Sequence, residues 1–388
     1  MSKYTFRNLV VDSRTGLNPR KNFILGEGNN YYITIKDIHN GRIVITEKTD
    51  RINDEAVEII KKRSRIKNGD ILFTSIGRIG ETAIVCNKDD TWEVNESIFI
   101  FTLNPEIIDA RYFCVLFQSP TIQDQLDRNS SGSTFKSIKM NQLEKMLFDL
   151  PSLEEQRTIA ATLDKVTTLI DKHKRQLKLL DGLVKSRFIE LFGDPKSNPK
   201  GYTKKQLGET CKVITGNTPS RAVAEYYGDH IEWIKTDNIV SGLLNPTTAT
   251  ECLSEKGMTV SRTVESGVIL MACIAGSVSS IGRVCVTNRK VAFNQQINAI
   301  IPYDYNILFL YAMLQISKEY LVDGINMALK GILSKSKLEE KTFFVPPIEL
   351  QEQFAAFVEQ TDKSKLAVQQ SLEKLETLKK SLMQEYFW

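Results

Sequence analysis

Two long segments of the chain place apolar residues at the spacing of one helix face. The first has no proline from Gln156 to Phe192, and steps of three and four residues from Leu163 meet an apolar residue at seven of nine positions. This spacing predicts a long α-helix with a coiled-coil seam rather than the alternation of a strand. Gly193 and Pro195 are expected to end the helix. The predicted seam residues are Leu163, Val166, Ile170, Leu177, Leu180, Val184 and Leu191.

The same pattern returns in the last part of the chain, where residues 345–388 repeat residues 150–193 without a gap. The identical pairs include Pro151 and Pro346, Gln156 and Gln351, and Phe192 and Phe387. This second seam is interrupted by Lys365 and Lys379, and its apolar members are Val358, Val368, Leu372, Leu375 and Leu382. Each apolar stripe is too narrow for its helix to be buried in a core, and an isolated apolar seam is unstable in water. We therefore expect the two helices to pair, and the alternative is that each packs on its own neighbouring domain.

The regions before the two helices repeat more faintly. YITIKDIHNG, which begins at Tyr32, aligns with WIKTDNIVSG, which begins at Trp233. NGDILFTSIGRIG likewise resembles SGVILMACIAGSVSSIGR. The matching residues are mostly those that build turns and cores, whereas the polar residues differ. The sequence therefore predicts four parts: a first head at 1–149, a helix at 150–193, a second head at 194–344 and a helix at 345–388.

Both heads mix short β-type runs with helical stretches. Gly and Asn separate the strands, which favours an α+β head with a curved antiparallel sheet. The clearest predicted helices are 110–126 and 307–322. The predicted strands are 31–35, 70–75 and 98–103 in the first head, and 232–234, 268–274 and 299–301 in the second. The predicted fold class is α+β, with two homologous globular domains separated by two long helices.

The composition is that of a folded protein of two or three domains, with 388 residues of which 41% are hydrophobic and 25% charged. The longest apolar stretch, near 268–275, is far too short to span a membrane, and the start MSKYTFRNLV lacks a secretory pattern. The six cysteines form no CxxC pair, and only three histidines are present. We therefore expect no metal site, no membrane contact, and free thiols in a cytoplasmic protein.

The sequence offers no recognisable catalytic site. It contains no GxxxxGK[ST] phosphate loop and no GxSxG motif, and VPPIE at Val345 lacks the Asn and the aromatic residue of an amino-methyltransferase tetrapeptide. Glu339 and Lys341 have the spacing of a nuclease ExK motif, but no Pro-Asp partner precedes them. We therefore expect no catalytic residues and no cofactor in this chain.

Basic residues recur in the irregular parts of both heads, although the net charge is only +4. Phosphate binding needs such cations, and Ser, Thr and Asn beside them can position a duplex or meet base edges. A single charge run is usually a solvated surface, but its recurrence in both heads favours a polyanion ligand. The candidate DNA contacts are Asn18, Arg20, Lys36, Arg78, Thr134 and Lys136 in the first head, and Thr218, Ser220, Arg221, Lys235, Ser277 and Lys330 in the second.

Over essentially its whole length the chain resembles the specificity (S) subunits of type I restriction–modification enzymes. The resemblance is carried by LPSLEEQRTIAATLD, by the exit FGDP that begins at Phe192, and by GNTPSRAVAEYYG in the second head. It implies two target-recognition domains on an antiparallel, pseudo-two-fold coiled coil, reading a bipartite site in double-stranded DNA. It also implies two modification (M) subunits with S-adenosylmethionine and two restriction (R) subunits, with ATP and Mg expected on these partners. The first head departs from the pattern with LNPRK where the second has NTPSR.

Two other readings stay open from the sequence alone. A structural adaptor would use the coiled coil to join protein partners and would not read DNA. A nuclease with a diverged site would cleave DNA in the presence of Mg²⁺. DNA binding at two salt concentrations separates the adaptor from a DNA reader, because lost phosphate contacts reduce the salt dependence.

Overall fold

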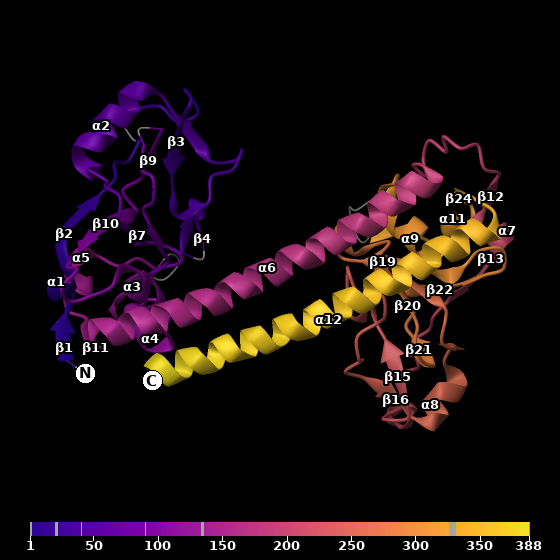
Figure 1. The fold of residues 1–388 in the computed structure, drawn as a ribbon. Helices are drawn as coiled ribbons and strands as arrows, with labels where there is room; N and C mark the ends of the chain where they lie inside the picture. Colours follow the sequence, from indigo (N-terminus) through magenta and orange to yellow (C-terminus); the bar gives the residue numbers. More distant parts are fainter. Residues whose placement is uncertain are drawn as a thin grey trace. The chain divides into compact units, whose positions relative to one another are not determined.

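The computed structural model describes residues 2–19, 22–39, 41–89, 91–132, 136–325 and 331–387. It divides into two compact units, Met1–Lys172 with Glu373–Trp388, and His173–Leu372. Each unit therefore contains one head, the start of one long helix and the end of the other (Figure 1).

The first head is built around a four-stranded antiparallel sheet with the order β2-β10-β7-β8. A second, three-stranded sheet has the order β6-β3-β9. The strands of these sheets are β2 (Val10–Thr15), β10 (Ile98–Leu103), β7 (Ile71–Thr74), β8 (Thr82–Ile84), β6 (Asp50–Ile52), β3 (Asn30–Ile33) and β9 (Trp92–Val94). Two short pairs join β1 (Ser2–Thr5) to β11 (Leu147–Leu150), and β4 (Ile38–His39) to β5 (Arg42–Ile43). The helical segments are α1 (Phe6–Leu9), η1 (Ile35–Asp37), α2 (Asp54–Ser64), α3 (Ala110–Leu116), α4 (Pro120–Asn129) and α5 (Met140–Leu143).

The second head repeats this plan with a four-stranded sheet of order β13-β22-β18-β20 and a five-stranded sheet of order β14-β16-β15-β21-β17. Their strands are β13 (Cys211–Thr215), β22 (Ile297–Pro302), β18 (Ile269–Ala272), β20 (Val284–Val286), β14 (Tyr227–Gly228), β16 (Cys252–Leu253), β15 (Ile231–Ile234), β21 (Val291–Phe293) and β17 (Thr263–Val264). The short pairs are β12 (Lys204–Gln206) with β24 (Thr342–Phe344), and β19 (Ile274–Ala275) with β23 (Gly331–Ile332). The helical segments are α7 (Leu207–Thr210), η2 (Ala224–Tyr226), η3 (Thr236–Asn238), α8 (Glu255–Val260), η4 (Val278–Ser280), α9 (Ile307–Ile316), α10 (Lys318–Val322) and α11 (Lys335–Glu339).

The predicted α+β class is confirmed, with two corrections in detail. The second sheet of each head contains one parallel pair, β3 with β9 and β15 with β21, so the heads are not wholly antiparallel. The two predicted head helices are each broken. In the first head the break precedes Pro120, whose ring cannot continue a helix, and Ser119 caps the new start. In the second head the helix breaks at Ser317.

The long helices α6 (Leu153–Phe192) and α12 (Ile348–Phe387) are each 40 residues long. Within the second unit they run antiparallel: the His173 ring is 2.9 Å from the Ser371 hydroxyl, and Lys365 Nζ is 2.5 Å from Asp181. Lys365 therefore interrupts the apolar seam, but its charge is paired with Asp181 and is not left buried alone. Within the first unit Leu163 of α6 packs with Met383 of α12. The expected pairing of the two helices is confirmed.

The glutamine shared by the two repeats ties each long helix to its head. Gln156 accepts a hydrogen bond from the Asp109 amide at 3.0 Å, and Gln351 accepts one from the Asn306 amide at 2.9 Å. Asp109 and Asn306 in turn cap α3 and α9, and both glutamines are 1% exposed. Each helix start therefore packs on its own head as well as joining the helix pair.

Candidate nucleic-acid interface

Arg78 lies next to the segments that carry two other candidate contacts of the first head, Lys36 and Lys136. Its guanidinium donates at 3.3 Å to the carbonyls of Ile35 and Ile38, which flank Lys36 in η1. The neighbouring Gly77 amide donates to the carbonyl of Lys136 at 3.1 Å. Three predicted contacts from distant parts of the sequence thus lie on adjoining segments, and all three side chains are exposed.

The cations of this first-head cluster are only partly neutralised. Arg78 pairs with Glu81 at 2.7 Å, and Lys136 pairs with Asp127 at 2.8 Å. These four residues line one groove of about 420 Å³. Exposed pairs of this kind are weak and can exchange for phosphate contacts.

The remaining candidates of the first head are less informative. Asn18 donates its side-chain amide to the Glu96 carboxylate and is half-buried, so it is held by the head itself. Arg20 and Thr134, like Lys330 of the second head, lie outside the described residues.

The second head presents its candidates around a carboxylate that the sequence did not single out. Thr218, Ser220 and Arg221 are exposed on the segment between β13 and η2. Both terminal nitrogens of Arg221 donate to Glu251, and Lys235 Nζ contacts the same carboxylate. Two predicted cations are therefore joined by one anion.

Two aromatic rings support the same cluster. The Arg221 guanidinium carbon lies 4.3 Å from the centroid of Tyr227 and 5.3 Å from that of Trp233, and Lys235 Nζ lies 5.1 Å from Trp233. Cation–π contacts of this length add to the ion pair. The hydrogen bond from Arg221 is the largest cause that lowers the pKa of Glu251 to about 2, so the carboxylate is ionised at neutral pH.

The equivalent position of the first head carries different residues. In the strand pair β6–β3 of the first head, Asp50 lies opposite Tyr32. In the second head Glu251 lies beside Trp233, the counterpart of Tyr32, and the Trp233 amide donates to the Glu251 carbonyl at 3.1 Å. The cap of the 3₁₀ turn is Thr34 in the first head and Lys235 in the second. The first head instead stacks Arg51 over Tyr31 at 3.9 Å. Glu251, Tyr227 and Arg51 were missed by the sequence reasoning because only strand register brings them to these places.

Ser277 lies apart from this cluster in the contacts of the described chain. Its hydroxyl is 3.0 Å from that of Ser279 and 2.9 Å from that of Ser280, in the turn η4. That turn also receives the Lys318 ammonium through the Ser279 carbonyl at 2.5 Å.

The predicted seam positions are not exposed in the structure. Leu163, Val166, Ile170 and Val358 are buried. The half-buried seam residues are Leu177, Leu180, Val184, Leu191, Val368, Leu372, Leu375 and Leu382. The exposed large apolar residues on the long helices lie elsewhere, and they include the repeat-equivalent pair Leu183 and Leu378, at 48% and 45% exposure.

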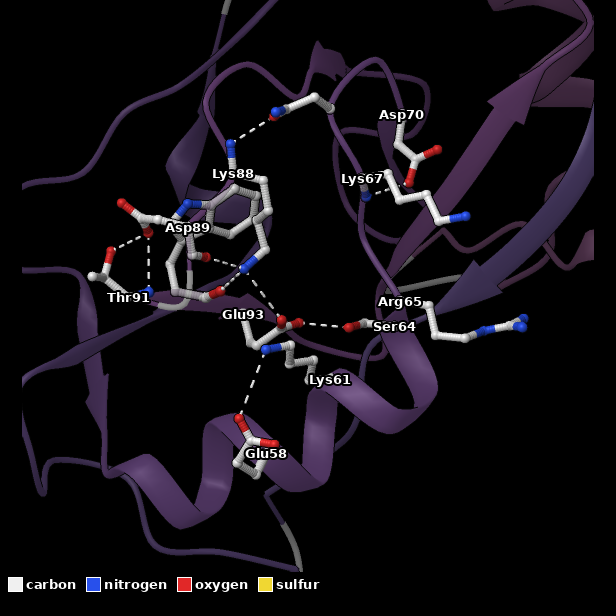
Figure 2. A network of polar contacts seen from close by, with 12 residues as sticks. Glu58, Lys61, Ser64, Arg65, Lys67, Asp70, Lys88, Asp89, Thr91 and Glu93 are labelled. Carbon is white, nitrogen blue, oxygen red and sulfur yellow. Dashed lines mark hydrogen bonds and ion pairs between the residues drawn. The ribbon is translucent and has the colours of Figure 1, made fainter.

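A buried charge network distinguishes the interior of the first head (Figure 2). Glu93 in β9 is fully buried, accepts from the Ser64 hydroxyl at 2.6 Å and lies 3.3 Å from Lys88 Nζ. Lys88 also donates to the carbonyl of Trp92 at 2.7 Å. Burial raises the pKa of Glu93, against the opposing charge of Lys88. The position equivalent to Glu93 in the parallel strand of the second head is the apolar Ala292.

The geometry defines a protein made of two copies of one unit, in which each α+β head is followed by a long helix. A family model described as the type I restriction modification DNA specificity domain matches residues 8–180 and 199–378. The chain therefore belongs to this family, and the resemblance inferred from its motifs is confirmed.

Known relatives agree. The chain is 26% identical over 351 residues to the specificity subunit of the type I restriction enzyme MjaIX from Methanocaldococcus jannaschii, covering 84% of this chain and 79% of that protein. It is 28% identical over 216 residues to the EcoBI specificity subunit from Escherichia coli, covering 54% and 42%. The crystal structure of a type I restriction–modification S subunit from M. genitalium has the same fold, with a TM-score of 0.63 at 15% identity over 98% of this chain and 94% of that one.

Within the described part of the chain, no helix is both long and apolar enough to cross a membrane.

Proposed function

We propose that this chain reads DNA sequence for a type I restriction–modification complex, with each head reading one half of a bipartite, asymmetric target in double-stranded DNA. The observation that carries the proposal is that the specificity domain occurs twice, with one framework and two different polar surfaces. Unlike surfaces on a shared framework fit two unlike half-sites, because base edges are read by side chains whereas phosphates are met by any cation. The two long helices would set the length of the unread gap.

The proposed partners are two M subunits and two R subunits. The catalytic steps would be carried out by these partners, which would bind S-adenosylmethionine, ATP and Mg. This chain would perform no catalytic step and carry no cofactor. The helix pair offers the M subunits two equivalent surfaces, because Leu183 and Leu378 occupy the same position of the repeat and are both exposed. This division of labour is consistent with a cytoplasmic complex that acts on DNA.

The decisive experiment is reconstitution of the chain with M subunits and S-adenosylmethionine, followed by mapping of the methylated adenines. We expect methylation at one bipartite sequence, and exchange of residues 1–149 for another head is expected to change one half-site only. Methylation that ignores sequence, or an exchange that changes both halves, would contradict the proposal. The adaptor alternative predicts that DNA affinity is unchanged by replacing Lys36, Lys136 or Lys235.

The docking surfaces can be tested separately by Leu183→Glu and Leu378→Glu. Each substitution puts a charge on an apolar surface that binding would desolvate, and each is expected to remove one M subunit, as measured by the mass of the complex. Ser364→Glu, on an exposed polar position of α12, is the control and should leave both M subunits bound. Loss of both M subunits from a single leucine substitution would contradict two equivalent surfaces.

A further inference from the structure

Two arginine–glutamate pairs occur among the described residues of the second head, and they differ in how many N–H donors of the arginine remain without a partner. Arg289 places Nε and Nη2 on Glu232 at 2.6 and 2.8 Å, and its Nη1 donates to Asn288 at 2.7 Å. It also reaches the carbonyls of Pro246 and Thr247. Arg289 therefore has its donors committed to the head itself, as expected of an arginine that fixes local structure.

Arg221 has a different pattern. Its two terminal nitrogens meet the two oxygens of Glu251, and no other hydrogen bond of its side chain occurs among the described residues. Its side chain is 58% exposed. Nε–H and one N–H on each terminal nitrogen donate no hydrogen bond to the described residues, while the guanidinium carbon lies over the rings of Tyr227 and Trp233. Arg221 is thus fixed in orientation but still has N–H donors available for a ligand.

Glu251 also changes the charge of this surface. A carboxylate that contacts both Arg221 and Lys235 occupies the place where a phosphate oxygen would meet these cations. Glu81 and Asp127 of the first head each pair with one cation, whereas Glu251 pairs with two. A phosphate group of the DNA backbone must therefore break both contacts of Glu251 or approach its negative charge, and both are unfavourable. A base edge carries no net charge, so it can accept from the outward N–H groups of Arg221 with Glu251 still in place.

We infer that Glu251 is the specificity-determining positioning residue of the second head, which holds Arg221 for a base edge and disfavours sequence-independent phosphate binding. This inference rests on the proposed function. It assigns the two roles of the cluster to different residues: Arg221 reads, and Glu251 orients it and suppresses unspecific attraction. The guanine edge is the commonest partner of an arginine held in this way.

The test uses the full chain with Glu251→Gln, which keeps the size of the side chain and removes its charge. Binding to duplexes of several unrelated sequences is measured at two salt concentrations. We expect affinity for all of them to rise about threefold or more at low salt, and the slope of log affinity against log salt to steepen by about 0.9, because one more phosphate is neutralised. In the complex with M subunits, discrimination against single-base changes in the second half-site should fall about fivefold or more.

Glu225→Gln is the matched control, because Glu225 lies in the same head, is exposed and pairs with one lysine, Lys256. It removes the same charge and should leave the salt slope and the discrimination at their wild-type values. A second control repeats Glu251→Gln in a chain that also carries Arg221→Ala and Lys235→Ala, where the gain in affinity should vanish. The inference is supported if Glu251→Gln raises the affinity for DNA and both controls give the results stated above.

The inference is overturned if Glu251→Gln matches Glu225→Gln in salt slope and discrimination, or if its effect persists without the two cations. These outcomes leave the proposed function intact as long as the wild-type complex still methylates one bipartite site. Sequence-independent methylation by the wild-type complex would overturn both, so the two failures are distinguishable.

Discussion

Gly16 of the first head and Gly216 of the second make the same close approach to a neighbouring backbone, whereas Thr34 and Lys235, at one equivalent turn, differ in charge. A Cβ on Gly16 would lie 1.9 Å from the Val94 carbonyl oxygen, and one on Gly216 would lie 2.1 Å from that of Asn294. Positions that shape the backbone are thus shared, while the cap of the 3₁₀ turn, half-buried in both heads, carries a different residue in each. The two heads therefore hold their backbone by common contacts and leave their surfaces free to specify different ligands.

The interiors are not wholly shared either. The β9 strand of the first head buries Glu93 with Lys88, where the second head has Ala292 in β21. A buried ion pair is weak evidence for stability, because desolvation of two charges opposes their attraction. The first head therefore carries a polar network in its core that the common framework does not require.

The largest expected effect tests the shared backbone. Gly16→Ala and Gly216→Ala each force a methyl group into backbone atoms that cannot rotate away, so each is expected to lower the unfolding free energy of its head by about 4 kcal/mol or more. Denaturant unfolding followed by fluorescence measures the loss. Gly276→Ala is the control, because a Cβ there meets nothing within 4 Å, and it should be close to neutral. A large loss from only one of the two glycines would break the equivalence of the heads.

The sequence predicted the parts that repeat or have a clear period. The 3–4 spacing predicted α6 and α12, Gly193 ends α6 with its amide on the Ile189 carbonyl at 2.8 Å, and all six predicted strands are present within about two residues. The repeated Gln156 and Gln351 were visible as a match, but their role as tethers depends on the capped helices of the heads.

The rest depends on contacts that sequence spacing does not encode. Glu251 joins Arg221 only because β16 lies beside β15, and Lys88 meets Glu93 only because a turn folds back inside the head. The candidates on adjoining segments, Lys36, Arg78 and Lys136, were predicted from their polarity and from matching positions in the two heads, whereas their proximity comes from hydrogen bonds of the intervening backbone. Polar residues on a variable surface follow no hydrophobic period, so a single sequence cannot rank them.

A second, smaller effect tests the core difference. Glu93→Ala gives the first head the residue of the second but leaves Lys88 buried without its carboxylate, so it is expected to cost about 3 kcal/mol of unfolding free energy. Adding Lys88→Met removes the stranded charge and should recover a large part of that loss in a double-mutant cycle. Thermal or denaturant unfolding of Glu93→Ala, Lys88→Met and the double variant measures this recovery. If the double variant is as unstable as Glu93→Ala alone, Lys88 is not the cause of the loss.

The smallest expected effect is a difference in sign between the heads as pH changes. Burial raises the pKa of Glu93, so the folded first head binds the carboxyl proton more tightly than the unfolded chain does. The stability contributed by this tighter proton binding is present at low pH and is lost as pH rises above the ordinary carboxyl range. The hydrogen bond from Arg221 lowers the pKa of Glu251 to about 2, so its stability is present above that range and is lost as pH falls toward about 2. Unfolding free energies of Glu93→Gln and Glu251→Gln, measured between about pH 3 and about pH 7, should therefore diverge. Relative to wild type, Glu93→Gln gains stability with rising pH and Glu251→Gln loses it, the latter by less than about 1 kcal/mol because its ion pairs are partly exposed. Slopes of the same sign would show that the two carboxylates do not differ in the way their surroundings indicate.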